Sequence, residues 1–376
     1  MAVKTGARFF WQVLLRAVVL LAVINLLFAA SRPLPVVGKW SAYNSLFPGR
    51  LRLPFGERPD LAYNFSLYSL DAMIGSHEVA QPRPVDEYRL IVLGDSSVWG
   101  TLLRPEETLT GQINAAGLHA PDGRRVRAYN LGYPTISVTK DLLFLSRVVQ
   151  YQPDMILWPV TLEALPRHTQ LRSPILQNNP QPVRNLAKAY NLNLETAEDR
   201  LIEPGFWQQT ILGQRRNLAD IFRLQMYGVM WAATGIDQYY PESYTPTAND
   251  LEADQSFRDL QPPDLSPDDL ALDVLAAGHE MALGIPLLLI NEPVFISSGE
   301  NSDIRYNFFY PKWAYDDYRQ ILLAEAQRNG WHYVDAWDLI APTEFTNSAI
   351  HLTPVGSAQF ARAIIPYLME LVGEVK

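Results

Sequence analysis

The sequence predicts an α/β fold of three layers, in which helices cover both faces of a central sheet of five parallel strands. Two observations support this prediction. From about residue 88 onward, short apolar runs alternate with longer segments whose apolar residues recur at helical spacing. The runs are nearly continuous in apolar residues, which is typical of parallel strands that are buried on both faces.

The predicted strands and helices follow one another along the chain. The apolar runs lie at residues 88–94, 125–132, 154–162, 285–294 and 331–339. Helices are expected over residues 105–117, 137–150 and 355–372. The alternation stops between residues 166 and 268, so we expect an α/β domain over residues 86–372 that a large insertion interrupts.

The first 31 residues are predicted to form an N-terminal transmembrane anchor. Their apolar stretch, residues 9–30, has about the length needed to span a bilayer. It exceeds the apolar core of about 7–15 residues that is usual in a signal peptide. A cleaved signal peptide is the alternative, because Arg16 and Asn25 interrupt the stretch and small residues end it. Basic residues precede it, which predicts a single-pass protein of the cell membrane with its main domain outside the cytoplasm.

Two further segments differ from the α/β rhythm. Residues 32–85 are rich in proline and aromatic residues, and we expect an extended juxtamembrane segment there. The insertion, residues 166–268, carries many prolines, an acidic tract and a helix-like stretch at 217–235. Such an insertion commonly forms a lid, a partner surface or a membrane-facing piece. For the helix-like stretch, packing on the core is favoured over contact with lipid or an acyl chain.

Composition excludes several classes of function. A net charge of -9, without a basic stripe beyond the N-terminus, argues against nucleic-acid binding. The absence of cysteine excludes disulfides, thiol nucleophiles and cysteine-based zinc sites. None of the six histidines is paired at metal-ligand spacing, so we expect neither a metal centre nor another cofactor.

Polar residues follow the predicted strands at the edge where ligands of a doubly wound sheet bind. Ser96 and Ser97 follow the first strand, and Gly132 ends the second. Thr161 lies near the end of the third strand, and His351 follows the last. A serine attacks a carbonyl usefully only beside a base, and the near-neutral pKa of histidine suits that role. An early serine and a late histidine at one rim would form such a pair.

Three segments at this rim resemble signature blocks of the SGNH, or GDSL-type, hydrolases. "GDSSVWGTLLRPEETLTGQI" at 94–113 resembles the first block, and "YNLGYPTIS" at 129–137 resembles the second. "IHLTPVGSAQFA" at 350–361 resembles the last. The resemblance covers residues 86–372 without the insertion, and it implies a flavodoxin-like three-layer sandwich in a membrane-anchored member of the esterase or acyltransferase type.

The resemblance assigns roles to several residues. It implies that Ser96 is the nucleophile and that His351 is the general base. The amides of Ser96 and Gly132 would hold the oxyanion. Ser97 has no role in the family, and we expect it to cap the following turn.

The oxyanion hole and the acid of the triad both depart from the family pattern. The third strand ends "LWPVTLEAL" without the family's asparagine, and Thr161 is the nearest polar substitute. Loss of one oxyanion donor costs on the order of a hundredfold or more in rate. Ser348 stands where the triad aspartate is expected, with Asn347 one residue before it, and neither stabilises an imidazolium as a carboxylate would. The acids nearby that could replace it are Asp335, Asp338 and Glu344.

Asn291 and Glu292 end the fourth strand at the same rim. One interpretation is a buried polar turn held by backbone hydrogen bonds. The other makes them pocket residues that substitute for the missing asparagine or the missing acid. Geometry has to decide between the two.

Two functions therefore compete. The first is a membrane-anchored serine esterase or O-acyltransferase that acts on an ester of a cell-envelope carbohydrate or lipid. For it the resemblance also implies a membrane-bound O-acyltransferase as partner. The second is a non-catalytic SGNH-like module that binds glycan or scaffolds a membrane complex, which the missing asparagine and aspartate favour. Retention of Ser96, Gly132 and His351 together favours the enzyme.

Overall fold

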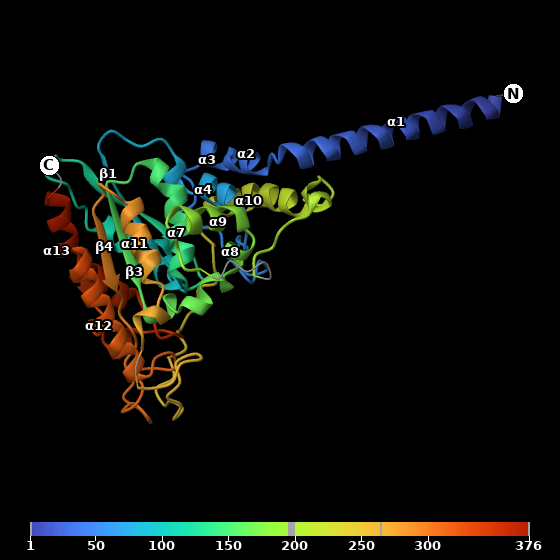
Figure 1. Ribbon diagram of the computed structural model, residues 1–376. Coiled ribbons are helices and arrows are strands. Elements are labelled where there is room, and N and C mark those ends of the chain that lie inside the picture. Colours follow the sequence, from blue (N-terminus) through green and yellow to red (C-terminus); the bar gives the residue numbers. More distant parts are fainter. Residues whose placement is uncertain (1, 195–199, 264, 375–376) are drawn as a thin grey trace.

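A sheet of five parallel strands forms the centre of the computed structural model, which describes residues 2–194, 200–263 and 265–374 (Figure 1). The strands are β1 (Glu87–Gly94), β2 (Arg125–Gly132), β3 (Met155–Val160), β4 (Leu287–Asn291) and β5 (His332–Asp335). Their order is β2-β1-β3-β4-β5. Each strand falls on one of the five apolar runs, and the predicted α/β fold class is confirmed. The order of the strands reverses beside β1, which is where ligands of such sheets bind.

Helices cover both faces of the sheet, and this explains why the strands lack alternation. Leu90 and Val92 of β1 pack in one cluster with the helices α6 and α13. Ile91 and Leu93 pack in the other cluster with α7, α11 and α12. Successive side chains of a strand point to opposite faces, so a strand buried on both sides is apolar throughout. These helices are α6 (Leu109–Ala115), α7 (Val138–Val148), α11 (Leu272–Met281), α12 (Lys312–Asn329) and α13 (Pro354–Glu374).

The other helices of the described chain lie outside the two layers that cover the sheet or connect its elements. The remaining α-helices are α1 (Ala2–Ser31), α2 (Leu34–Lys39), α3 (Ala42–Leu46), α4 (Leu70–Ser76), α5 (Ser96–Trp99), α8 (Pro174–Gln177), α9 (Pro180–Ala189) and α10 (Arg215–Thr234). The 3-10 turns are η1 (Glu78–Ala80), η2 (Pro105–Glu107), η3 (Val149–Tyr151), η4 (Leu162–Ala164), η5 (Arg167–Arg172), η6 (Phe206–Gln209), η7 (Pro267–Asp269) and η8 (Pro342–Glu344).

The segment 32–85 is folded, whereas we expected an extended chain. It holds three short helices, and Leu53, Leu67 and Met73 belong to the larger core cluster. Arg52 is fully buried and forms a salt bridge of 2.6 Å with Asp237 of the insertion. Frequent prolines keep its helices short and hide their periodicity. The missing period therefore reflects short elements and not a lack of burial.

The insertion packs on the domain through its helices. α8 and α9 lie against α7, and α10 lies against α3 and α4. Ile221, Leu224 and Trp231 are the buried side of α10, as expected for a helix that packs on the core. A methyl group added at Gly228 would lie 2.8 Å from the ring of Tyr43, so α10 and α3 approach closely there. The opposite side of α10 exposes Phe222, Met226 and Met230.

Helix α1 projects away from the domain (Figure 1). Its part Gly6–Ser31 is long and apolar enough to cross a membrane, and an 18-residue stretch within it has a mean hydropathy of 2.6. Most of its side chains are exposed, unlike those of a core helix. Length and composition therefore agree with a membrane span.

Candidate active site

Ser96 follows directly on the turn that ends β1. Gly94 has a φ of +149°, and a methyl group there would lie 2.5 Å from the side chain of Val98, so the turn requires glycine. The chain then enters α5, whose N-cap is Asp95: its carboxylate accepts a hydrogen bond of 2.8 Å from the Ser97 amide. The expected cap at Ser97 is therefore wrong, because the preceding aspartate already fills that position. This turn presents the Ser96 hydroxyl at the carboxyl end of the sheet.

His351 lies within hydrogen-bond distance of Ser96. It sits in the loop before α13, and its Nε2 is 2.8 Å from Ser96 Oγ. On the other side of the ring, Nδ1 is 3.1 Å from Asn347 Oδ1. An amide oxygen only accepts, so Nδ1 carries the proton and Nε2 is free to accept the serine proton. The three side chains are thus linked in the order of a nucleophile, its base and an orienting group.

The other four side chains proposed to orient His351 lie elsewhere in the described structure. The Glu344 carboxylate accepts a hydrogen bond from Thr353, and the Asp335 carboxylate binds Asn291 and Arg319. The structure describes no contact of Asp338 or Ser348 side chains with the His351 ring. The ring therefore has an amide partner, Asn347, and no carboxylate partner on Nδ1.

Burial controls the protonation of His351. It lowers the pKa of the imidazole to about 4, and the carboxylate of Asp95 opposes this shift without overcoming it. At neutral pH the ring is therefore uncharged and is able to accept a proton. Because Asn347 carries no charge, it holds the ring without stabilising the imidazolium that would form.

The predicted oxyanion donors are only partly available. The Gly132 amide donates a hydrogen bond of 3.0 Å to Asn130 Oδ1, whose amide group in turn donates to Val98 O at 2.7 Å. A methyl group at Gly132 would lie 2.4 Å from Trp99 N, so this glycine serves the close packing of β2 against α5. Its predicted contact with the oxyanion requires the bond to Asn130 to open.

Thr161 does not replace the missing asparagine in this conformation. It is fully buried, and its hydroxyl is 2.7 Å from the hydroxyl of Tyr310. Of the three predicted donors, the Ser96 amide, first in α5, is the one without a hydrogen-bond partner in the described chain.

Asn291 has a structural position. Its side chain is fully buried, and its amide donates to Asp335 Oδ1 at 2.8 Å. Its Oδ1 accepts hydrogen bonds from the hydroxyls of Tyr315 and Tyr318 at 3.2 and 3.1 Å. Its side-chain amide and oxygen are both bonded to side chains of β5 and α12, not to the backbone groups that we expected for a buried polar turn.

Glu292 has a different environment. The hydroxyl of Ser97 donates to its Oε2, and its Oε1 is buried without a hydrogen-bond partner in the described residues. Burial, assisted by the nearby charge of Asp95, raises its pKa well above the usual range. Burial therefore favours the protonated, neutral form of this carboxyl beside the nucleophile turn. Sequence reasoning missed its pairing with Ser97, for which neither residue carries a local signal.

Two buried cations hold the nucleophile turn in place. Lys140 Nζ donates to the carbonyls of Gly94 and Tyr133 at 2.6 and 3.2 Å. Arg52 Nη1 donates to the carbonyls of Trp99, Gly100 and Leu103 at 3.2, 2.9 and 2.9 Å. The Trp99 and Gly100 carbonyls lie at the end of α5 and that of Leu103 lies in the following turn, where one guanidinium reaches all three. The segment 32–85 thus supports the site through Arg52.

The insertion crosses the rim of the sheet as a strap, residues 237–258, that binds one loop after another. Gln238 bonds with Leu102 beside α5, and Arg258 forms a salt bridge with Glu163 after β3. Between them, the Thr247 hydroxyl is 2.7 Å from Thr346 O and 3.0 Å from Ser348 O. These carbonyls flank Asn347, so the strap determines the position of the residue that orients His351.

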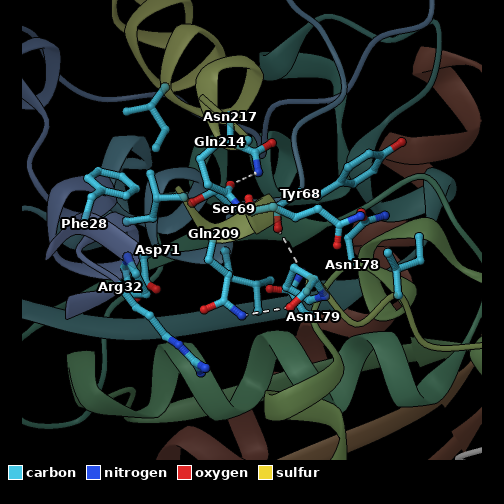
Figure 2. A pocket seen from close by; sticks show the side chains of 18 residues that line it. Phe28, Arg32, Tyr68, Ser69, Asp71, Asn178, Asn179, Gln209, Gln214 and Asn217 are labelled. Atoms are coloured by element: carbon cyan, nitrogen blue, oxygen red, sulfur yellow. Dashed lines mark hydrogen bonds between the residues drawn. The ribbon is translucent and has the colours of Figure 1, made fainter. Parts of the chain in front are cut away.

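Two cavities of different size lie beside Ser97 and beside the end of α1. Ser97 and Glu292 line a small cavity of about 10 Å³, the size of roughly one water molecule. A cavity of about 450 Å³ lies elsewhere, between the end of α1 and the insertion (Figure 2). In the described part of the chain, no three His, Asp or Glu side chains gather as metal ligands would.

Comparison with known proteins finds solved structures of low similarity, among them esterases and a lipase. No protein-family model and no curated protein matches the sequence. Similar solved structures include an acetylxylan esterase mutant from Geobacillus stearothermophilus, with 12% identity and a TM-score of 0.35 over 76% of this chain and 94% of that one. A GDSL-like lipase from Bacteroides thetaiotaomicron shows 11% identity and a TM-score of 0.36 over 77% and 92%. A carbohydrate acetylesterase family member from Sinorhizobium meliloti shows 10% identity and a TM-score of 0.32 over 76% of this chain and 99% of that one. Such similarities are too low to assign chemistry, for which the geometry of Ser96 and His351 is the basis.

Proposed function

We propose that this chain is a serine esterase or O-acyltransferase, anchored by α1, that acts outside the cytoplasm on an ester of a cell-envelope carbohydrate or lipid. The observation that carries the proposal is the distance of 2.8 Å between Ser96 Oγ and His351 Nε2, with Asn347 on the other ring nitrogen. A serine needs this arrangement to act as a nucleophile. Lys4 and Arg8, which precede the apolar stretch of α1, support a main domain outside the cytoplasm.

The reaction would proceed in two halves. Ser96 Oγ attacks the ester carbonyl while His351 Nε2 takes its proton, and the oxyanion forms beside the Ser96 amide. Collapse of the tetrahedral intermediate breaks the ester bond, and His351 returns the proton to the leaving alkoxide. His351 then takes a proton from a second hydroxyl, whose oxygen attacks the carbonyl carbon of the acyl group on Ser96. Collapse of this second intermediate breaks the bond to Ser96 Oγ, and His351 returns the proton to that oxygen. Water as the second hydroxyl gives hydrolysis, and a carbohydrate hydroxyl gives transfer.

The site is weaker than a full triad for two physical reasons. Asn347 orients the imidazole but supplies no negative charge to the imidazolium. The Gly132 amide is already bonded to Asn130, so it strengthens the oxyanion hole only if substrate displaces that bond. We expect a slow enzyme, or one whose rim rearranges when substrate binds.

Labelling with a fluorophosphonate tests the nucleophile. The neutral His351 should activate Ser96, so the wild-type chain becomes labelled and Ser96→Ala does not. Ser97→Ala is the matched control, because it removes the neighbouring hydroxyl and leaves the Ser96–His351 pair intact. Equal labelling of wild type and Ser96→Ala would show that the nucleophile is another residue.

The non-catalytic glycan-binding or scaffolding module is the second candidate, and the engaged Gly132 amide and the buried Thr161 favour it. In that case a folded wild-type chain remains unlabelled. A membrane-bound O-acyltransferase is the proposed partner, supported by the motif resemblance and by α1. Co-purification of the full chain from membranes, compared with a chain whose α1 is replaced by an unrelated span, tests the partner separately.

A further inference from the structure

One part of the insertion lies beside the membrane-span candidate. Residues 202–214, called the tip below, include η6 and lie next to α1 where this helix leaves the domain (Figure 1). The Leu212 amide donates a hydrogen bond of 3.1 Å to Asn25 Oδ1. Asn25 is one of the two polar residues that interrupt the apolar stretch, and it is buried. The polar residue in α1 is thus the point where the tip attaches.

The position of Asn25 along α1 indicates how far into a bilayer the tip would reach. The candidate span Gly6–Ser31 has 26 residues, which corresponds to a helix of about 39 Å at a rise of about 1.5 Å per residue. The hydrocarbon core of a bilayer is about 30 Å thick, so the ends of this helix extend into the headgroup layers. Asn25 lies six residues before Ser31, or about 9 Å along the axis. The tip therefore reaches the boundary between the headgroups and the hydrocarbon.

The side chains of the tip suit that boundary. Phe206 is 48% exposed, Trp207 is 74% exposed and Leu212 is 58% exposed, although all three lie in the segment that contacts α1. Arg215 and Arg216 follow immediately in α10 and are also exposed. Aromatic residues beside cations are typical of protein segments at the membrane–water interface.

The other side of the tip lines a cavity of about 450 Å³ together with Phe28 and Arg32 at the end of α1 (Figure 2). The carboxamides of Gln208, Gln209 and Gln214 lie there beside Ile202 and Pro204. Phe206, Trp207 and Leu212 do not line this cavity and are exposed. Next to its attachment point, Leu26 and Leu27 of α1 are exposed as well. The apolar surface of the tip therefore continues that of the span.

We propose that the tip is a second membrane contact, which inserts Phe206, Trp207 and Leu212 into the leaflet on the domain's side of the bilayer. The inference rests on α1 as a membrane span, which is part of the proposed function. Lipid covers the exposed apolar side chains of the tip, because the tip is attached to a residue inside the span and continues the span's apolar surface. Two attachments orient the domain on the membrane, whereas one helix alone leaves it free to rotate.

The absence of cysteine makes a direct test simple. Single-cysteine variants Trp207→Cys, Phe206→Cys and Leu212→Cys of the full chain are labelled with an environment-sensitive nitrobenzoxadiazole probe. The labelled chains are reconstituted into phosphatidylcholine vesicles with and without doxyl-labelled lipid. Leu20→Cys in α1 reports on the span, and Leu283→Cys, at a side chain that is 88% exposed far along the chain from α1, is the matched surface control.

The outcomes separate the inference from the proposed span. We expect doxyl lipid to quench the probes at residues 206, 207, 212 and 20 at least threefold more than the probe at 283. Quenching at residue 20, with positions 206, 207 and 212 equal to the control, overturns the inference and leaves the span intact; it is also the result expected if the tip binds a protein. Absence of quenching at residue 20 overturns the span itself.

Discussion

Ser96 and Ser97 are neighbours in one turn, and each is bonded to a group that titrates. Ser96 faces the His351 imidazole, and Ser97 faces the Glu292 carboxyl. Burial favours the uncharged form in both partners: it lowers the pKa of His351 and raises that of Glu292. The consequence is opposite, because a neutral imidazole can accept a proton from serine whereas a neutral carboxylic acid already carries its proton and cannot act as a base. The same physical effect thus prepares one serine for attack and leaves the other inert.

Removal of the base His351 should produce the largest difference in activity between variants at the two serine sites. His351→Gln deprives Ser96 of its proton acceptor, and we expect turnover of a chromogenic acetyl ester to fall by about 10³-fold or more. Ser97→Ala should retain activity within about threefold, since Glu292 takes no proton from Ser97. Steady-state kinetics with folding verified by circular dichroism measures both. A comparable loss in the two variants would mean that the serines act together.

The second prediction concerns the charge beside His351. In wild type the imidazole has a pKa of about 4, so kcat/KM should stay level from neutral pH down to about pH 5 and fall only near pH 4. Asn347→Asp places a carboxylate on Nδ1, which raises the pKa of His351 and moves the acid limb to higher pH. It should also raise kcat at pH 8, on the order of tenfold, by stabilising the imidazolium. A pH profile identical to that of wild type would exclude Asn347 as the orienting residue.

A smaller effect is expected from the strap. Thr247 donates to the carbonyls on both sides of Asn347, so Thr247→Val should loosen the orientation of His351 and reduce kcat a few-fold. Thr247→Ser keeps the hydroxyl and should restore kcat. Because the effect acts through His351, the KM should change less than kcat. Loss of thermal stability with unchanged kcat would assign Thr247 a structural role only.

The last prediction concerns how the free energy of unfolding depends on pH through Glu292. Glu292 is protonated in the folded chain and ionises near its ordinary pKa of 4.5 when unfolded. The unfolded state therefore binds fewer protons, and stability falls as the pH rises above about 4.5. Glu292→Gln does not titrate, so its free energy of unfolding relative to wild type should increase from pH 5 to pH 8 in urea melts. A difference that is constant with pH would mean that Glu292 is ionised in the folded chain.

Much of the fold was predictable because its signals are local. Each strand coincides with an apolar run, because helices cover both faces of the sheet and most of the strand side chains between them are apolar; Glu87 and Arg89 of β1 are buried as an ion pair. The helix over 217–235 was predictable from its own spacing and matches α10. The folded state of residues 32–85 was not, because its evidence lies in partners elsewhere, such as Asp237 for Arg52. Proline-rich segments carry little periodicity whether or not they are buried.

The features of the candidate site likewise fall into those that the sequence predicted and those that required the tertiary structure. The sequence by itself determined which strand ends carry Ser96 and His351, because the carboxyl ends of parallel strands meet at one edge. Only the tertiary structure decided that Asn347 contacts the imidazole among five candidates, that Asn130 accepts a hydrogen bond from the Gly132 amide, and that burial raises the pKa of Glu292. Hydrogen-bond partners and pKa values depend on burial and on residues distant in the chain, here including the strap that holds the Asn347 loop. A local sequence pattern therefore does not predict hydrogen-bond partners or pKa values that depend on residues far away in the chain.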